Sequence, residues 1–140
     1  MSSLDHISLH STTRSRAEIL MDRLSLGLAA AMMLLGLRQW AIIVGLAAGP
    51  GGGFETMPQI WQLATMHLGV VDLIAAVGLW LRSSWGRVVW IVAAVSEVAM
   101  HSVFIGTFGA NFVIVAFHAA ALAAMLVTWI GVRRAAKANH

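Results

Sequence analysis

Four ionisable residues stand inside long apolar stretches of this chain, where they could bind a proton, an ion or a cofactor: Arg38, His67, Asp72 and Glu97. A charged side chain near the centre of a bilayer costs at least about 2.5–3.5 kcal/mol on insertion scales, so it normally faces protein and finds a partner there. Such residues also mark proton relays, ion paths and ligand sites. We therefore expect the four residues to form a buried polar network.

The sharpest structural expectation is an ion pair between Arg38 and either Glu97 or Asp72, because a buried charge should be paired or neutralised. If Asp72 takes the arginine, Glu97 is free to bond His67. If Glu97 takes it, Asp72 points roughly 140° away from His67 around the helix and would carry a proton, since burial disfavours the charged form. The network could fix helix register or serve a function, and both interpretations stay open.

Three histidines in apolar stretches, His67, His101 and His118, could instead be ligands. Two of them could supply axial nitrogens to haem b, or bind a metal together with Glu97, which stands four residues before His101. No local haem or metal motif is present. We therefore expect no cofactor and no catalytic residue, with haem b as the alternative, and the sequence does not determine whether a metal binds.

The composition places these residues in a membrane protein. Of 140 residues, 59% are hydrophobic and 11% are charged, and the mean hydropathy is +0.82. This leaves too little polar side chain to cover a soluble globule. The absence of cysteine removes disulfides and thiolate metal sites. The net charge of +3 does not indicate nucleic-acid binding, because the basic residues flank apolar segments without interleaved aromatic residues.

Four apolar segments predict an all-α integral membrane protein, an antiparallel four-helix bundle, since about 20 apolar residues cross a bilayer. We expect a tail at residues 1–23, a transmembrane domain at 24–132 with spans at 24–48, 58–81, 88–106 and 112–132, and a basic tail at 133–140. Arginine and lysine lie in both tails and in the turn between the second and third spans. Both termini are therefore expected on the cytoplasmic side.

Depth along each span can be counted from its outer end at about 1.5 Å per residue. Arg38, His67 and Glu97 then lie together roughly 14–15 Å down, near the middle of a hydrocarbon core of about 30 Å. The same count places His101 and His118 roughly 8–9 Å down. It predicts that Glu97 is level with His67 rather than with His118.

Two segments, MPQIWQLATMHLGVVDLIAAVGLWL at residues 57–81 and WGRVVWIVAAVSEVAMH at residues 85–101, carry a resemblance to a known group. The chain resembles small four-helix inner-membrane proteins of unknown function from alphaproteobacteria, particularly rhizobial relatives. The resemblance covers most of the chain after the N-terminal tail. It implies a multi-pass protein of the bacterial inner membrane and supplies no catalytic residues.

The first functional hypothesis is a non-enzymatic accessory or interaction subunit of a cell-envelope process, because short loops leave little material outside the bilayer for a soluble substrate site. Its partners would be the lipid bilayer, other copies in a homo-oligomer, or other membrane proteins. One alternative is an oligomeric proton- or ion-coupled small transporter that relays protons through Glu97, His67 and Asp72. The other is a haem-b electron carrier.

Overall fold

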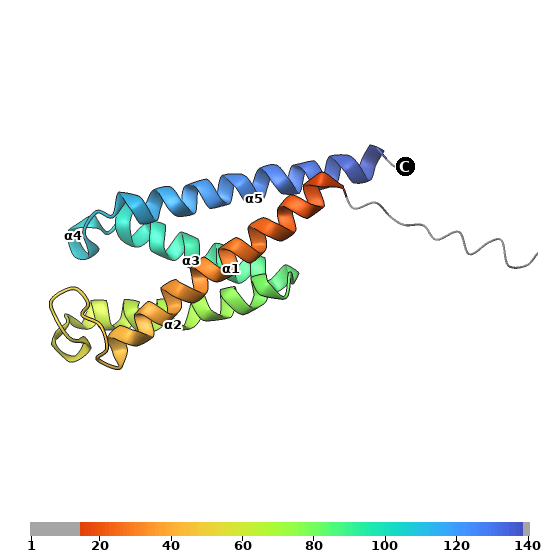
Figure 1. Ribbon diagram of the computed structural model, residues 1–140. Coiled ribbons are helices and arrows are strands. Elements are labelled where there is room, and N and C mark those ends of the chain that lie inside the picture. The colour runs from red at the N-terminus through yellow and green to blue at the C-terminus, as the bar shows by residue number, and fades with distance from the viewer. Residues whose placement is uncertain (1–14, 139–140) are drawn as a thin grey trace, which may run out of the picture.

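The structure, a computed structural model, describes residues 15–138, and most of them are helical (Figure 1). The four long helices are α1 (Arg16–Ile43), α2 (Gln59–Trp80), α3 (Ser84–Ser102) and α5 (Phe112–Ala138). Two short elements lie between them, the 3-10 helix η1 (Phe54–Thr56) and the single turn α4 (Ile105–Phe108). Within residues 15–138 no β-strand forms. The all-α prediction is confirmed.

Three of the long helices, α1, α2 and α5, are long and apolar enough to cross a membrane. The prediction of a membrane protein is supported at this level. The remaining long helix, α3, is less apolar because it carries Arg87, Glu97 and His101. Residues 1–14 of the predicted tail at residues 1–23 lie outside the part of the chain that the structure describes.

Local capping fixes the start of α1, which begins earlier than the expected first span. The Ser15 hydroxyl accepts a hydrogen bond from the Glu18 backbone N–H at 3.3 Å, and the Glu18 carboxylate accepts one from the Ser15 N–H at 2.8 Å. This reciprocal capping box satisfies backbone donors that the helix itself cannot. Helix α1 ends at Ile43, just before Gly45 at φ 79°.

The bounds of α3 also differ from the expected third span. The Ser83 hydroxyl accepts a hydrogen bond from the Gly86 N–H at 3.0 Å, which caps the helix and starts it at Ser84. The helix ends at Ser102 instead of continuing to Gly106, and the chain then turns through α4. The C-terminal end of α3 is therefore four residues earlier than Gly106, the end that the sequence count assumed.

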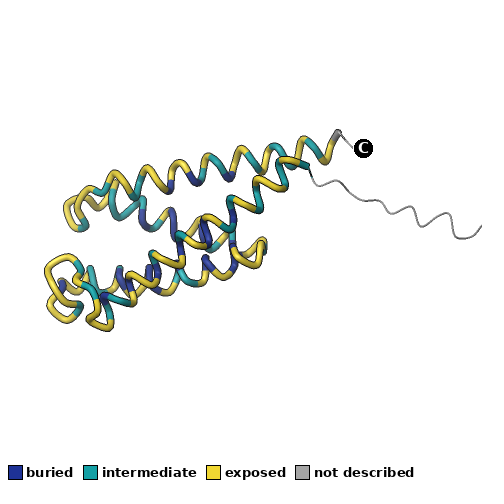
Figure 2. Tube along the Cα trace, viewed as in Figure 1, coloured by how far each residue is buried: buried dark blue, intermediate teal, exposed yellow. Residues whose placement is uncertain are grey.

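The helices pack tightly at one end of the bundle and diverge at the other. Helix α1 lies against α2 over much of its length. The N-terminal end of α1 meets α5, and the two helices separate toward α4 (Figure 1). The apolar core lies between the helices and is centred on Met32, Leu79 and Trp90, none of which is exposed (Figure 2). Small residues such as Ala75 and Ala93 fill the remaining core space.

The closest approach of α2 and α3 is at two glycines, Gly78 and Gly86. A Cβ atom on either one would collide with the backbone of the other. Ser83 reinforces this corner, because its hydroxyl donates a hydrogen bond to the Gly78 carbonyl oxygen at 2.9 Å. The turn between these helices is therefore built on direct backbone contact.

We predict that Gly86→Ala destabilises the protein, because the added methyl group forces two backbones apart, and overpacking of this kind costs typically about 1–3 kcal/mol. Gly27→Ala is the matched control, since a Cβ there meets nothing within 4 Å. Alanine in a helix interior is favoured over glycine by roughly 0.5–1 kcal/mol. Thermal unfolding in detergent should show a lower midpoint for Gly86→Ala and an equal or higher one for Gly27→Ala. Equal midpoints for both variants would contradict the close contact.

Candidate functional site

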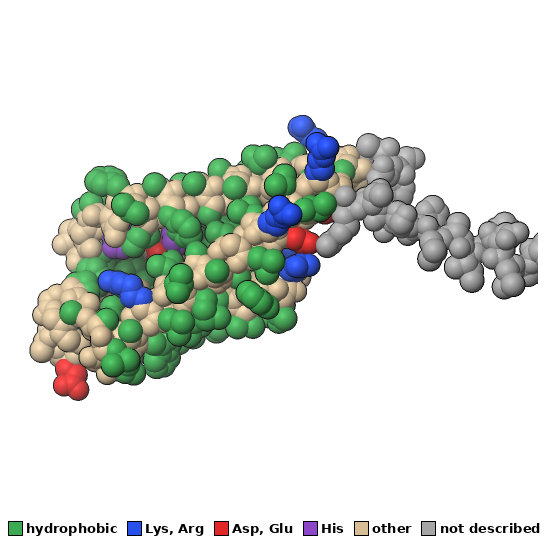
Figure 3. Space-filling view, viewed as in Figure 1, with side chains coloured by type: hydrophobic (Ala, Val, Ile, Leu, Met, Phe, Trp, Pro, Cys, Tyr) green, Lys and Arg blue, Asp and Glu red, His purple; other side chains and the backbone are tan. Residues whose placement is uncertain are grey.

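A polar cavity of about 140 Å³ lies where α1 and α5 diverge. Its polar lining comes from α1, α2, α3 and the residue just before α5: Arg38, Gln39, Thr65, Glu97, His101 and Asn111. The space-filling view shows this region as a hollow, with histidine and acidic side chains inside it and a basic side chain beside it (Figure 3). Polar side chains therefore gather at the loosely packed end of the bundle.

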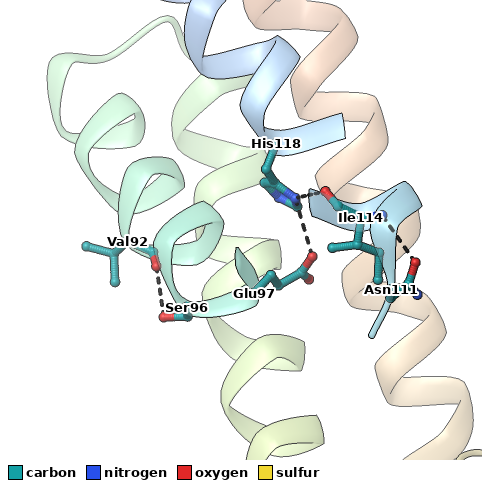
Figure 4. Close-up of polar contacts among 6 residues, drawn as sticks. All are labelled: Val92, Ser96, Glu97, Asn111, Ile114 and His118. Carbon is teal, nitrogen blue, oxygen red and sulfur yellow. Dashed lines mark hydrogen bonds and ion pairs between the residues drawn. The ribbon is translucent and has the colours of Figure 1, made fainter. Parts of the chain in front are cut away.

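The closest buried ionisable pair is Glu97 on α3 and His118 on α5 (Figure 4). Glu97 Oε2 lies 3.6 Å from His118 Nδ1, and both side chains are almost fully buried. The same Nδ1 lies 3.1 Å from the carbonyl oxygen of Ile114. A carbonyl oxygen can only accept, so Nδ1 carries the hydrogen and donates it, which leaves Nε2 as an acceptor in the neutral ring. That Nε2 atom is buried and has no hydrogen-bond partner.

The end of α3 explains why these two residues are level. Glu97 lies five residues before Ser102, or about 7.5 Å from the helix end, and His118 lies six residues after Phe112, or about 9 Å. The sequence count extended the helix to Gly106 and so placed Glu97 too deep. Sequence reasoning therefore missed this pair, although it had marked both residues.

Asp72 on α2 is also fully buried, and neither of its carboxylate oxygens has a hydrogen-bond partner. It lies close enough to Glu97 for the two carboxylates to repel each other. A buried carboxylate without a partner is costly as an anion. Asp72 is therefore a second buried acid whose carboxylate no hydrogen-bond donor within residues 15–138 satisfies.

Arg38 does not form the expected ion pair. Its side chain is exposed at the cavity, where it attracts Glu97, but among residues 15–138 it lies within 4.0 Å of neither Glu97 nor Asp72. The physical reason is the path of α1, which lies on α2 and moves away from α5 at this end (Figure 1). The expected ion pair of Arg38 is corrected to a longer-range attraction.

His67 and His101 have separate neighbours. His67 is exposed on the outside of α2, and its Nε2 lies 3.4 Å from the Ser96 hydroxyl oxygen, whose own hydrogen is donated to the Val92 carbonyl (Figure 4). His101 Nδ1 lies 3.0 Å from the Gly109 carbonyl oxygen. His67 therefore does not bond Glu97, and the predicted four-residue network is split.

The haem and metal hypotheses fit this geometry poorly. Across the described part of the chain, no group of three or more histidine and acidic side chains is arranged to hold a metal ion. The cavity of about 140 Å³ is smaller than the roughly 300–1,000 Å³ of most cofactor and ligand sites. Among residues 15–138, the structure therefore shows no three-ligand metal site, and the cavity is small for haem.

These features define a helical protein with three helices long and apolar enough to cross a membrane and a small polar cavity between its helices. A model described as a family of unknown function (DUF6163) matches residues 20–136. Because the match covers most of the chain, the protein belongs to this family. No curated protein and no solved structure matches the chain.

We predict that Glu97 and His118 are energetically coupled. Removing one partner leaves the other buried and unpaired, so the effects of Glu97→Gln and His118→Gln should not add, and contacting residues typically differ from additivity by about 0.5–3 kcal/mol. Denaturant unfolding in detergent micelles of the two single variants and the double variant measures this coupling. His67→Gln combined with Glu97→Gln is the control and should be additive within about 0.5 kcal/mol. Additivity in both cycles would show that the pair is not coupled.

Proposed function

We propose that this protein takes up and releases a proton at Glu97 inside the membrane, as a proton-coupled transporter that works as an oligomer. The observation that carries the proposal is the polar cavity that reaches Glu97, with His118 Nδ1 3.6 Å from the Glu97 carboxylate. Buried ionisable residues of this kind mark proton relays in membrane proteins. Helix association through a paired network is less well supported, since both Asp72 oxygens lack a partner.

In the proposed chemistry, the Glu97 carboxyl group is neutralised either by a bound proton or by the nearby cation of Arg38. When Glu97 is protonated, it is neutral and is stable in apolar surroundings. When it loses the proton, the anion needs a counter-charge, and Arg38 at the cavity can move toward it. Arg38 is always charged, so its position would report the protonation state of Glu97.

The apolar core gives the proposed path its direction. Met32, Leu79 and Trp90 fill the bundle beyond the cavity. A proton entering from the cavity end therefore meets Glu97 before a closed apolar layer. Crossing this layer would require helix movement or a second copy, because four helices rarely enclose a pathway alone.

The proposed topology is a four-helix bundle in a bacterial inner membrane, with both termini in the cytoplasm. Support comes from the positive-inside rule, since Arg82, Arg87, Arg133 and Arg134 lie at the end of the bundle where α1 begins and α5 ends. In this orientation the cavity opens toward the outer side. Helix α3 would cross the membrane with its Glu97 face turned inward.

An accessory role is the second candidate, and the outer surface of the bundle favours it. Large apolar side chains such as Leu34, Val127 and Phe112 are exposed, while the loops between helices are short. Partners would therefore be met through helix faces in the bilayer. On this alternative, Glu97 would affect assembly without binding or releasing protons.

We predict the topology from single cysteines, which are informative because the chain has none of its own. Lys137→Cys should react with a membrane-impermeant maleimide only in inverted inner-membrane vesicles. Ala110→Cys should react in intact spheroplasts. The reverse pattern would show the opposite orientation, and labelling of both cysteines from one side would show that α5, which separates the two positions, does not cross the membrane.

We predict that Glu97 exchanges a proton with the medium. Infrared difference spectra of the reconstituted protein between alkaline and acidic buffers should show the carbonyl band of a protonated carboxyl group. Glu97→Gln should remove most of that band. Glu55→Gln should change the spectrum little in the buried-carboxyl region, because Glu55 lies in the exposed η1 turn.

Asp72→Asn separates the two buried acids in the same experiment, because it removes only the contribution of Asp72. A Glu97→Gln spectrum identical to that of the wild type would show that Glu97 does not titrate. That result would remove the proton-coupled function and leave the accessory role.

A further inference from the structure

A second and much larger groove lies between α3 and α5, near the chain termini and away from the polar cavity. Its volume is about 580 Å³, and its walls are almost wholly apolar, including Ile91, Leu122 and Leu126. It extends from Ser84 to Ile91 along α3, which is about 10 Å at the helical rise. The groove is therefore a long apolar channel on the outer face of the bundle.

One end of this groove is basic. Arg87 and Ser84, at the start of α3, line the groove there, and Trp129 lines it from α5. The Arg133 guanidinium lies 3.9 Å above the Trp129 ring, which brings a second cation to the same end. Across residues 15–138, Arg87 forms no ion pair with an acidic side chain. Its charge is therefore available to an anion.

We propose that this groove binds one anionic phospholipid, with the phosphate at Arg87 and Ser84 and one acyl chain along the apolar walls. The proposal rests on the membrane topology proposed above, which places Arg87 at the cytoplasmic interface, but not on proton coupling at Glu97. Basic pockets between transmembrane helices on the cytoplasmic side bind anionic head groups. An interfacial cation and an apolar channel reaching about 10 Å inward match the two parts of such a lipid.

A second copy of this chain fits the groove less well, because it would have to neutralise Arg87. Two described acids near this end of the bundle already have partners. Glu18 is held by its capping box with Ser15, and Asp22 lies 3.4 Å from Arg82. A phospholipid brings its own negative charge, so the charges favour lipid.

Native mass spectrometry of the detergent-solubilised protein tests the proposal, with phosphatidylglycerol and phosphatidylcholine of matched acyl chains as probes. Wild type should retain phosphatidylglycerol in preference to phosphatidylcholine. Arg87→Gln should lower phosphatidylglycerol retention about fivefold, the effect of one interfacial basic residue. Ala123→Leu should lower retention of both lipids, because Ala123 lines the groove.

Two controls separate the groove from general effects of charge and bulk. Arg134→Gln removes an equal charge from an exposed position, and Ala119→Leu adds an equal bulk to α5 at an exposed position outside the groove lining. Both should retain lipid as the wild type does. Equal loss with Arg134→Gln, equal binding of the two lipids, or a lipid-free dimer that Ala123→Leu dissociates would overturn the proposal.

A measurement on the unchanged protein keeps the test valid if a variant does not fold. Phosphatidylglycerol brominated on its acyl chain should quench tryptophan fluorescence more strongly than brominated phosphatidylcholine, since Trp129 lines the groove. Equal quenching by both lipids would overturn the proposal without any variant. A normal lipid preference together with an absent Glu97 carboxyl signal would leave the lipid site standing and remove the proton-coupled function.

Discussion

The high cost of an unpaired carboxyl group among apolar helices is the constraint on which the rest of this structure depends. Glu97 is buried on α3 with His118 at 3.6 Å, while Arg38 stays farther away. The imidazole Nδ1 hydrogen is already directed at the Ile114 carbonyl. Glu97 is therefore left with weak local compensation, and this is the condition under which a carboxyl group changes its protonation state when its surroundings change.

The close helix packing and the polar cavity lie at opposite ends of the bundle. At one end Gly78 and Gly86 bring the backbones of α2 and α3 into contact, and the core around Trp90 fills the space between the helices. At the other end α1 and α5 diverge, and polar side chains such as Arg38, Glu97 and His101 line part of the cavity there. The close contact makes the divergence possible, because a bundle held firmly at one end stays assembled while the other end encloses a cavity.

The sequence alone was sufficient for the helical class and for helices apolar enough to cross a membrane, because both follow from hydropathy over long windows. It was not sufficient for the Glu97 and His118 pair. That pair depends on α3 ending at Ser102, and the next glycine, Gly106, suggested a later end. The missing Arg38 ion pair depends on how α1 crosses the bundle, and the crossing of two helices is set by side-chain packing that hydropathy does not record.

The cavity and the groove lie on the same two helices, which has a physical consequence. Glu97 and His118 link α3 and α5 near the cavity end of the bundle, whereas Arg87 and Trp129 line the groove between the same helices toward the opposite end. A rigid helix that tilts about its middle must change its separation from a neighbour at both ends. Filling the groove with an acyl chain would therefore resist movements of α5 that bring Glu97 and His118 closer or farther apart. On that basis the lipid composition at the membrane surface near Arg87 would affect the protonation of Glu97, which lies toward the other surface.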